Sequence, residues 1–465
     1  MNAAGVAAGH PATAAAGVEV LAEGGSAADA AVAAGLASCV AETVMTGLLG
    51  GGHAIYLDAH TGVARNLDCF CATPGLGEPQ REPELVHLEV PFGEELVHYA
   101  VGPASCAVPG VPAGLHALWR EYGRLPWSRL VEPALRLARE GVPLPPAHAD
   151  CLEMLAPVFT LREGRRMYAP RGTLLRAGEL LEQPGLAAAL EAVAEEGAGS
   201  VYTGTIAESL LGLSDERGGR LTRADLASYA ASWSEPVETA WLGLRFLTRG
   251  GLSDVVPTLA RLPRLRGLAP TERLLALVAA LDGAPRPETH TTNLVAVDGD
   301  GSACVLTTSL GLGSGDWLPG LDLHLNSMLG ETDLLHGPLE PGGRMQSMMA
   351  PSLALDDRGL VLAIGAAGGT RLRTALLTVA AAILDEGVEP QQAVDEPRAH
   401  PAGPLVNAEP GTDEDALARL EASGRTVRRW PERHHYFGGV SAIGRTGRAA
   451  DPRRSGAALA APPAR

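Results

Sequence analysis

The pattern of apolar and polar positions divides the chain into a helix-rich first part and a strand-rich second part. Apolar residues recur with helical spacing in residues 12–40, 114–140, 186–232 and 270–283. From about residue 285 short apolar or alternating runs take over, separated by turn residues such as DGDG. Their order favours sheets with helices segregated to one side over a strict repetition of strand, helix and strand. We therefore expect an α+β fold.

Glycine and proline mark the boundaries of several expected elements. Ser26 follows two glycines and is placed to cap the helix that begins after it. The tract TGLLGGGHAIYLD, residues 46–58, predicts a glycine turn that leads into a strand. The uncharged run 96–119 is long enough to span a bilayer, but its three prolines break the helix that a membrane requires. It predicts buried strand and loop instead.

Charge and composition exclude several classes of partner and chemistry. The 465 residues carry 37 basic and 54 acidic side chains, a net charge of −17, which repels nucleic acid and anionic membranes at long range. We expect neither as a partner. All 37 basic residues are arginines, so a lysine Schiff base and a GxxxxGK[ST] phosphate loop are both impossible.

Cysteine and histidine spacing predicts no metal site and no cofactor. The six cysteines contain no CxxC pair, and the thirteen histidines are scattered apart from the adjacent His434 and His435. The first eighteen residues lack the basic start and leucine-rich centre of a secretory signal. Reduced thiols in the cytoplasm fit this sequence best.

Hydroxyl side chains are dense at the first strand of the second part. Residues 289–293 read THTTN, and TTS follows at 307–309. Threonine is a weak nucleophile, and one way to activate it is to free its own α-amino group as a base by cleaving the chain before it. Threonine is also simply favoured in strands, and the pattern alone leaves both explanations open. No GxSxG or GxGxxG motif offers another chemistry.

A resemblance to a known family separates these explanations. TTNLVAVDGDGSACVLTTSLGLGSG, residues 291–315, resembles the TTHxSVVDxxGNAVSxTxT…GSG segment that begins the small subunit of the γ-glutamyltransferase family, whose members are self-cleaving N-terminal-nucleophile hydrolases. Further tracts match in the family's order. They include residues 10–34 (HPLAsxAGxxILxxGGNAvDAAVA), 46–58 (SGIGGGGFxLxYD), 108–141 (VPGxxxG…PAixLAxxG), 221–229 (LTxeDLAxY), 364–371 (GSPGGsR) and 450–458 (ADPRxxGAA).

The resemblance implies an αββα sandwich that matures by cleaving itself between His290 and Thr291. Residues 1–290 then form a large-subunit segment, mainly helical with strands of the sandwich, and residues 291–465 form a strand-rich small-subunit segment. The two fragments of the same chain stay together. Thr291 becomes both the nucleophile and, through its new amine, the base.

Other site residues follow from the same resemblance. Ser309 matches a threonine whose hydroxyl hydrogen-bonds the nucleophile, and Thr307 is also retained. Gly368 and Gly369 match the glycine pair whose backbone N–H groups form the oxyanion hole, where a missing side chain lets the amides approach the developing charge. An ordinary strand-to-helix turn is the alternative explanation for these glycines.

The substrate-binding positions depart from the family pattern. Phe70 stands where the DFREtAP tract has the arginine that binds the α-carboxylate of a γ-glutamyl group, and Arg249 and Arg344 are left open as replacements. We expect Gly330 at the place of the aspartate that ends LLNNxMDD and receives the α-amino group. Ser347 keeps the first serine of RPLSSMsPT, and Met348 replaces the second.

These features predict a self-processing threonine hydrolase or acyltransferase with altered acyl-donor specificity. Its partners are a small-molecule acyl donor and water or an amine as acceptor. One alternative is a hydrolase of specialised metabolism that cleaves an amide or an activated C–C bond on the same scaffold. Another is an unprocessed paralogue that only binds its ligand, which Asn293 in place of the family's histidine keeps open.

Overall fold

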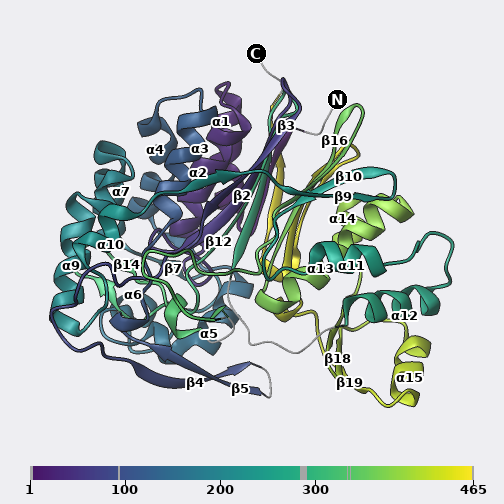
Figure 1. Cartoon of the computed structure of the whole chain (residues 1–465). Coiled ribbons are helices and arrows are strands. Elements are labelled where there is room, and N and C mark those ends of the chain that lie inside the picture. The colour runs from purple at the N-terminus through teal and green to yellow at the C-terminus, as the bar shows by residue number, and fades with distance from the viewer. Residues whose placement is uncertain (1–3, 93–94, 283–290, 332–333, 336, 463–465) are drawn as a thin grey trace.

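The computed structural model describes residues 4–92, 95–282, 291–331, 334–335 and 337–462, and two stacked antiparallel sheets form its centre (Figure 1). The first sheet has seven strands in the order β22-β1-β11-β12-β2-β3-β8. In chain order they are β1 (Gly5–Ala8), β2 (Gly51–Asp58), β3 (Val63–Cys69), β8 (Ser232–Ser234), β11 (Thr292–Val297), β12 (Ala303–Ser309) and β22 (Ala457–Ala460). Strand β11 lies between β1 and β12, so it is hydrogen-bonded on both sides.

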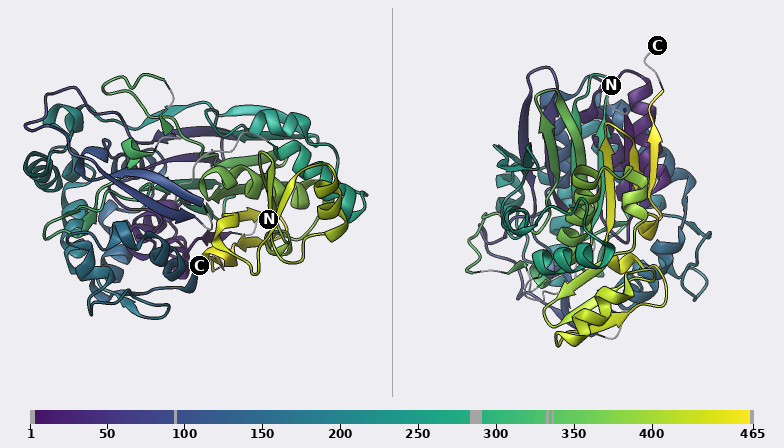
Figure 2. Two further views of the ribbon diagram at one scale, coloured as in Figure 1. Left: turned by 90° about the horizontal axis from the view of Figure 1, so that it is seen from below. Right: turned by 90° about the vertical axis from the view of Figure 1, so that its right-hand side faces the viewer.

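The second sheet has six strands in the order β21-β20-β16-β15-β10-β9. They are β9 (Val237–Trp241), β10 (Leu244–Thr248), β15 (Ser352–Asp356), β16 (Gly359–Ala367), β20 (Gly439–Gly444) and β21 (Arg448–Ala450). Strands from before and after residue 290 therefore occur in both sheets. The two ends of the described chain also lie side by side, because the N–H of Ala461 donates to the carbonyl of Ala4 at 3.1 Å (Figure 2).

The layer between the sheets is apolar over most of its area. Alternate positions of the strands point inward, as the period of two in a strand requires, and they include Ile55, Val295 and Val305 from the first sheet and Leu353 and Ile443 from the second. Burial of these side chains holds the sheets together.

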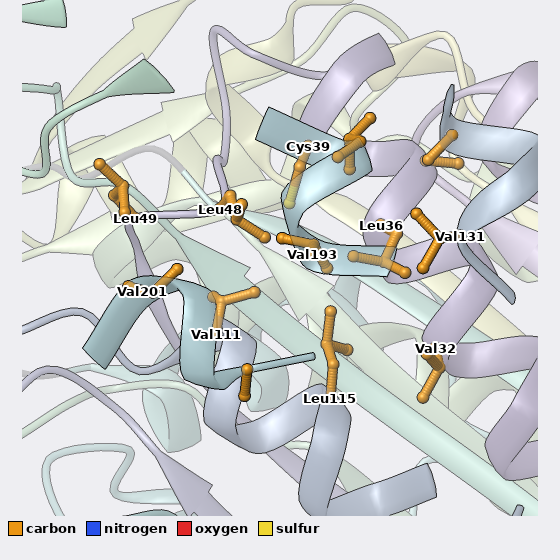
Figure 3. Close-up of a cluster of buried hydrophobic side chains, with 14 of the residues drawn as sticks. Val32, Leu36, Cys39, Leu48, Leu49, Val111, Leu115, Val131, Val193 and Val201 are labelled. Atoms are coloured by element: carbon orange, nitrogen blue, oxygen red, sulfur yellow. The ribbon is translucent and has the colours of Figure 1, made fainter. Parts of the chain in front are cut away.

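Helices of the first part cover the outer face of the first sheet. They are α1 (Pro11–Ala22), α2 (Ala27–Ala41), α3 (Val111–Tyr122), α4 (Trp127–Glu140) and α7 (Pro184–Glu196). Every residue of α2 is buried, and its many alanines let it pack closely against α1 and the sheet. Figure 3 shows Val32, Leu36 and Cys39 of α2 among apolar side chains of α3, α4 and α7. Ser26 caps α2 as expected: its Oγ accepts from the N–H of Asp29, whose carboxylate accepts from the N–H of Ser26.

The second sheet has helices on its own outer face. These are α11 (Val255–Arg261), α12 (Pro270–Leu281), α13 (Leu372–Ala381) and α14 (Pro390–Asp395). A small sheet of β17 (Ala399–Ala402), β18 (Leu405–Ala408) and β19 (Thr426–Arg429) with α15 (Glu414–Ala422) packs beyond α12. The expected mixture of helices and strands is thus confirmed, although the first part contributes more strands than its helical spacing suggests.

Part of the remaining chain packs around the apolar ring cluster of Phe159, Tyr168 and Trp317, and includes β4 (Val86–Phe92), β5 (Glu95–Val101), α5 (Pro146–Phe159), α6 (Gly164–Tyr168) and β7 (Leu180–Leu181). At the left of Figure 1, α8 (Gly199–Tyr202), α9 (Thr205–Arg217) and α10 (Arg223–Ser228) extend the apolar core of the helices on the first sheet. The short strands are β6 (Val142–Pro143), β13 (Trp317–Leu318) and β14 (Leu323–His324). Within the described ranges, none of the helices has both the length and the apolar character needed to cross a membrane.

Candidate active site

Thr291 directly precedes β11 and is buried, with 2% of its surface exposed. Thr292 faces Thr308 in the antiparallel register of β11 and β12. Continuing that register by one residue places Ser309 opposite Thr291. Ser309 is equally buried, and its Oγ accepts from the N–H of Gly311 at 2.9 Å. Two hydroxyl side chains therefore lie next to each other at the end of these strands.

The second sheet contributes the glycine pair at the end of β16. Gly368 and Gly369 have φ angles of 123° and 57°, a region that L side chains rarely adopt. A Cβ on Gly368 would lie 2.9 Å from the Cα of Gly438, so the turn into α13 has no room for one. Glycine is therefore required here both by the backbone conformation and by the lack of room for a side chain.

One cavity brings most of the expected site residues together. Of the residues that the sequence singles out, six line it, namely Phe70, Thr291, Ser309, Ser347, Met348 and Gly369. Gly368 adjoins Gly369. The rest of the wall is mostly apolar and consists of Met328, Leu334, Met349 and Leu372, with one carboxylate, Glu331. The cavity therefore offers hydroxyls at one end and an apolar wall around them.

Gly330 does not line this cavity, and the acidic residue that does is Glu331. A Cβ on Gly330 would lie 1.7 Å from the carbonyl oxygen of Ala100, so this residue packs against backbone. Glu331 is fully buried, and its Oε1 accepts from the N–H of Leu312 at 3.1 Å. Sequence reasoning missed Glu331 although the signal was present, since residues 324–331 match LLNNxMDD one for one and its last aspartate falls on 331.

A histidine lies directly behind Phe70. The rings of His53 and Phe70 stack with centroids 5.4 Å apart and 16° between their planes. His53 is 1% exposed, and burial, with smaller effects of Arg249 and Arg344, lowers the pKa of its imidazole well below the usual value. Its Nδ1 lies 3.6 Å from the Asp68 carboxylate. The imidazole is thus neutral near pH 7.

Neither arginine considered as an anion site lines the cavity. Arg344 donates to the carbonyls of Phe70 and Ala230 at 2.7 and 2.6 Å, and its guanidinium lies over the Tyr229 ring. Arg249 donates to the carbonyl of Ser347 at 3.0 Å. Both guanidinium groups therefore bind backbone around the cavity wall.

Asn293 and Thr307 are paired between the two sheets. The Thr307 hydroxyl donates to the Asn293 side-chain oxygen at 2.7 Å, and both residues are buried. A Cβ on Gly365 of the second sheet would lie 2.1 Å from that same oxygen, which shows that this pair points toward β16. Ser309, two positions further along β12 and on the same face, lines the acyl cavity.

The chemistry available at this site is that of hydroxyls, backbone amides and one carboxylate. Over the described ranges, no three His, Cys, Asp or Glu side chains are grouped so as to hold a metal ion. All six cysteines are free thiols and buried. Burial raises the pKa of thiols such as Cys39 and Cys106 to about 12, so they stay protonated.

Comparison with known proteins agrees with this geometry. A profile of the family described as Gamma-glutamyltranspeptidase matches residues 13–272 and 272–461. The chain belongs to this family. The resemblance drawn from the sequence tracts is thereby confirmed, and the family supports an enzyme of the hydrolase and acyltransferase type.

Relatives of this γ-glutamyltranspeptidase family member include hydrolases and acylases. Glutathione hydrolase proenzyme 1 of Schizosaccharomyces pombe is 28% identical, and the match covers 92% of this chain and 79% of the relative. The Acylase ACY 1 proenzyme of Pseudomonas sp. is 26% identical, covering 93% and 88%. Among solved structures, cephalosporin acylase from Bacillus halodurans superimposes with a TM-score of 0.81 at 24% identity, covering 99% of this chain and 96% of the other, which shows a shared fold.

Proposed function

We propose that the chain is a self-processing threonine hydrolase or acyltransferase that forms an acyl ester on Thr291 and has an altered acyl-donor specificity. The observation that carries this proposal is that Thr291, Ser309 and Gly369 line one cavity, although they come from three separate tracts. In our proposal residues 1–290 and 291–465 become the large and small segments of an αββα sandwich. The proenzyme names of the relatives support this maturation.

Processing would use the hydroxyl of Thr291 against the peptide bond before it. The oxygen attacks the carbonyl carbon of residue 290, the C–N bond breaks, and the nitrogen takes the hydroxyl proton to become an amine. Water then hydrolyses the resulting ester, which frees the carboxyl group of residue 290 and the Thr291 hydroxyl. His290 itself lies outside the described residues. The product is a threonine with a base attached to its own Cα.

Turnover would repeat this attack on the acyl donor. The new amine takes the hydroxyl proton, the oxygen attacks the donor carbonyl, and backbone N–H groups of Gly368 and Gly369 stabilise the negative oxygen. The proton passes to the leaving amine as the donor C–N bond breaks. Water or an amine then releases the acyl group from Thr291. Ser309 would hold the nucleophile by a hydrogen bond.

The cavity wall supports a donor that is less polar than a γ-glutamyl group. Phe70 and Met348 replace polar family residues in the wall, while Glu331 supplies a buried carboxylate near Thr291. Such a site favours an acyl chain with apolar surface, and it tolerates an amino group better than a carboxylate. Since a charged hydrogen bond contributes about 1.5–3 kcal/mol, loss of the arginine alone lowers affinity for the α-carboxylate about 10- to 150-fold.

Gel electrophoresis and mass spectrometry of purified protein test the processing step. We expect the 48.0 kDa chain to give two fragments that begin at residues 1 and 291, and Thr291→Ala to stay as one band. An intact chain after long incubation would instead support the unprocessed, ligand-binding paralogue.

Four matched p-nitroanilides test the donor. They are the γ-glutamyl compound, 4-aminobutanoyl without the α-carboxylate, glutaryl without the α-amino group, and butanoyl without either. We expect 4-aminobutanoyl and butanoyl to exceed glutaryl in kcat/KM, and γ-glutamyl to be turned over little. A fast γ-glutamyl reaction would contradict the altered specificity. The same apolar wall also suits the alternative of an amide or C–C bond hydrolase of specialised metabolism. Such an enzyme would differ in its acyl group and, where it cleaves a C–C bond, in expelling an activated carbon group that takes the proton in place of an amine.

A further inference from the structure

A second cavity lies on the other side of Thr291. It is lined by residues of both sheets, of helix α5 and of adjoining turns, among them Glu42, His148, Thr292, Ser441, Asp451 and Arg454. Thr291 is the residue that this cavity shares with the acyl cavity. The proposed chemistry uses none of the ionisable side chains here, so their presence next to the nucleophile needs another reason.

Glu42 is an ionisable side chain of this cavity that hydrogen-bonds the nucleophile strand. It follows α2 and is 1% exposed. One carboxylate oxygen accepts from the hydroxyl of Thr13 at 2.7 Å, and the other accepts from the hydroxyl of Thr292. Among the described residues these two threonine hydroxyls are its side-chain hydrogen-bond donors. Glu42 therefore connects helix α1 to the residue directly after Thr291.

The backbone is shaped to admit this carboxylate. A Cβ on Gly9, between β1 and α1, would lie 2.4 Å from the carboxylate and 2.8 Å from the Thr292 hydroxyl. Only glycine leaves that space free. On the other side of β11, the Ser441 hydroxyl donates to the carbonyl of Asn293 at 3.0 Å. The two residues after Thr291 are thus held from both faces of the sheet.

We infer that Glu42 is a positioning residue for Thr291, which acts through the Thr292 hydroxyl to fix the nucleophile for self-cleavage and acyl transfer. This inference rests on the proposed function. Its physical basis is that a nucleophile displaced by about 1 Å loses on the order of 100-fold in rate. A hydrogen bond to an ionised carboxylate is stronger than one to a neutral carboxyl group, so the ionised form of Glu42 holds Thr292 more firmly.

Glu42 is also the ionisable group of this cavity that titrates near neutral pH. Burial raises its pKa to about 7, against the hydrogen bonds of the two threonines and the charge of Arg454, which lower it. Burial lowers the pKa of His148 to about 3 and that of neighbouring His10 to about 4, so both are neutral. The pKa of Asp451, next to Arg398 and Arg453, lies below its usual value. Arg454 remains cationic.

The test measures the self-cleavage rate of the full chain between pH 6 and 8. Thr292→Val removes the hydroxyl and keeps the shape of the side chain, and we expect it to slow cleavage at least 10-fold at pH 8. The matched control is Thr308→Val, because Thr308 is the direct neighbour of Thr292 in the sheet and is as buried, but bonds Thr46 at 2.8 Å. We expect the cleavage rate of the control to stay within about threefold of that of the unsubstituted protein, because the Thr308 hydroxyl bonds Thr46 and not Glu42.

Glu42 is tested with two variants of different chemistry. Glu42→Leu should match Thr292→Val. Glu42→Gln keeps one acceptor oxygen and donates through its amide N–H at the other contact, as a protonated carboxyl group would, so it should retain the rate at pH 6. In the unsubstituted protein the rate should rise through about pH 7, and Glu42→Gln should flatten that rise. Equal rates for Thr292→Val and Thr308→Val, or an unchanged pH rise in Glu42→Gln, would overturn the inference. If the unsubstituted chain itself stays intact, the proposed function fails first, so the two failures are distinguishable.

Discussion

Phe70 and His53 form a stacked pair with ring centroids 5.4 Å apart. In the family tracts these two positions carry arginine and phenylalanine, so a cation beside an aromatic ring has become an aromatic ring beside a neutral imidazole. Because the two side chains touch, neither can be exchanged independently. In our proposal the altered donor specificity therefore depends on both residues.

This contact predicts how γ-glutamyl activity can be restored. Phe70→Arg alone adds a third guanidinium near His53 and should lower the melting temperature with little gain in activity. Phe70→Arg together with His53→Phe recreates the family pair, and we expect kcat/KM for γ-glutamyl-p-nitroanilide to rise about 10- to 100-fold over the unsubstituted protein. A gain of that size in the single variant would show that the two positions are uncoupled.

Met348 should determine preference for apolar acyl groups. Met348 and Met345 belong to the same buried cluster, but only Met348 lines the acyl cavity. Substitution of either by alanine should cost about 2–5 kcal/mol of unfolding free energy. Only Met348→Ala should also lower kcat/KM for butanoyl-p-nitroanilide, by about 10-fold or more. Denaturant unfolding and initial rates separate the two effects, and parallel losses of activity in both variants would contradict this role.

Ser309 should support catalysis through its hydroxyl. Ser309→Ala leaves Thr291 without its neighbour at the end of β12, and we expect both processing and kcat to fall about 10- to 100-fold. Ser309→Thr restores the residue of the family tract and should keep most of the activity. Processing is followed by electrophoresis and kcat by p-nitroaniline release. A fully active Ser309→Ala variant would remove this residue from the proposed mechanism.

Acid should destabilise the protein through its buried histidines. Burial lowers the pKa of His148, His324 and His400 to about 3, from an unfolded value of 6.5. Below about pH 6.5 the unfolded chain binds protons at these imidazoles that the native structure excludes, so stability is complete above pH 6.5 and falls toward pH 4. Glu42 has the opposite effect on stability, because folding raises its pKa from 4.5 to about 7 and its protonation in that range favours the native structure. The three histidines together outweigh this single group.

His324→Gln tests this linkage, because glutamine can still accept the hydrogen bond that His324 Nε2 takes from the N–H of Gly315. The slope of unfolding free energy against pH between 6 and 4 should decrease by up to about 1.4 kcal/mol per pH unit, the value for one proton. Urea unfolding at several pH values measures it. A slope equal to that of the unsubstituted protein would mean that native His324 carries a proton.

Site residues that belong to short sequence motifs could be predicted from the sequence. Site residues that are recognised by the direction in which their side chains point were harder to predict. Thr291, Ser309 and the glycine pair come from local motifs, and the structure brings them together. Gly330 and Glu331 differ by one position. The family tract aligned without a gap already points to 331, and the packing of Gly330 against Ala100 shows that Glu331 is the residue that lines the cavity. No periodicity carries that information.

The fold shows the same division. The cap at Ser26 and the glycine turn before β2 could be predicted from neighbouring residues alone, since caps and tight turns depend on a few residues. The contribution of early strands to both sheets could not be predicted in this way, because β10 pairs with β15 across about a hundred residues and β9 joins the sheet only through β10. Long-range pairing of this kind is set by the complete core.

The position of β11 inside the first sheet has a consequence for the mature enzyme. Its neighbours β1 and β12 lie on opposite sides of the proposed cut in the chain, so each fragment completes a sheet of the other. Once the bond is broken, the pieces remain interlocked, yet after denaturation they would have to find each other as separate molecules. The uncut precursor is therefore the form in which this architecture can be assembled efficiently, and heat or urea should inactivate the matured protein irreversibly while the Thr291→Ala precursor recovers.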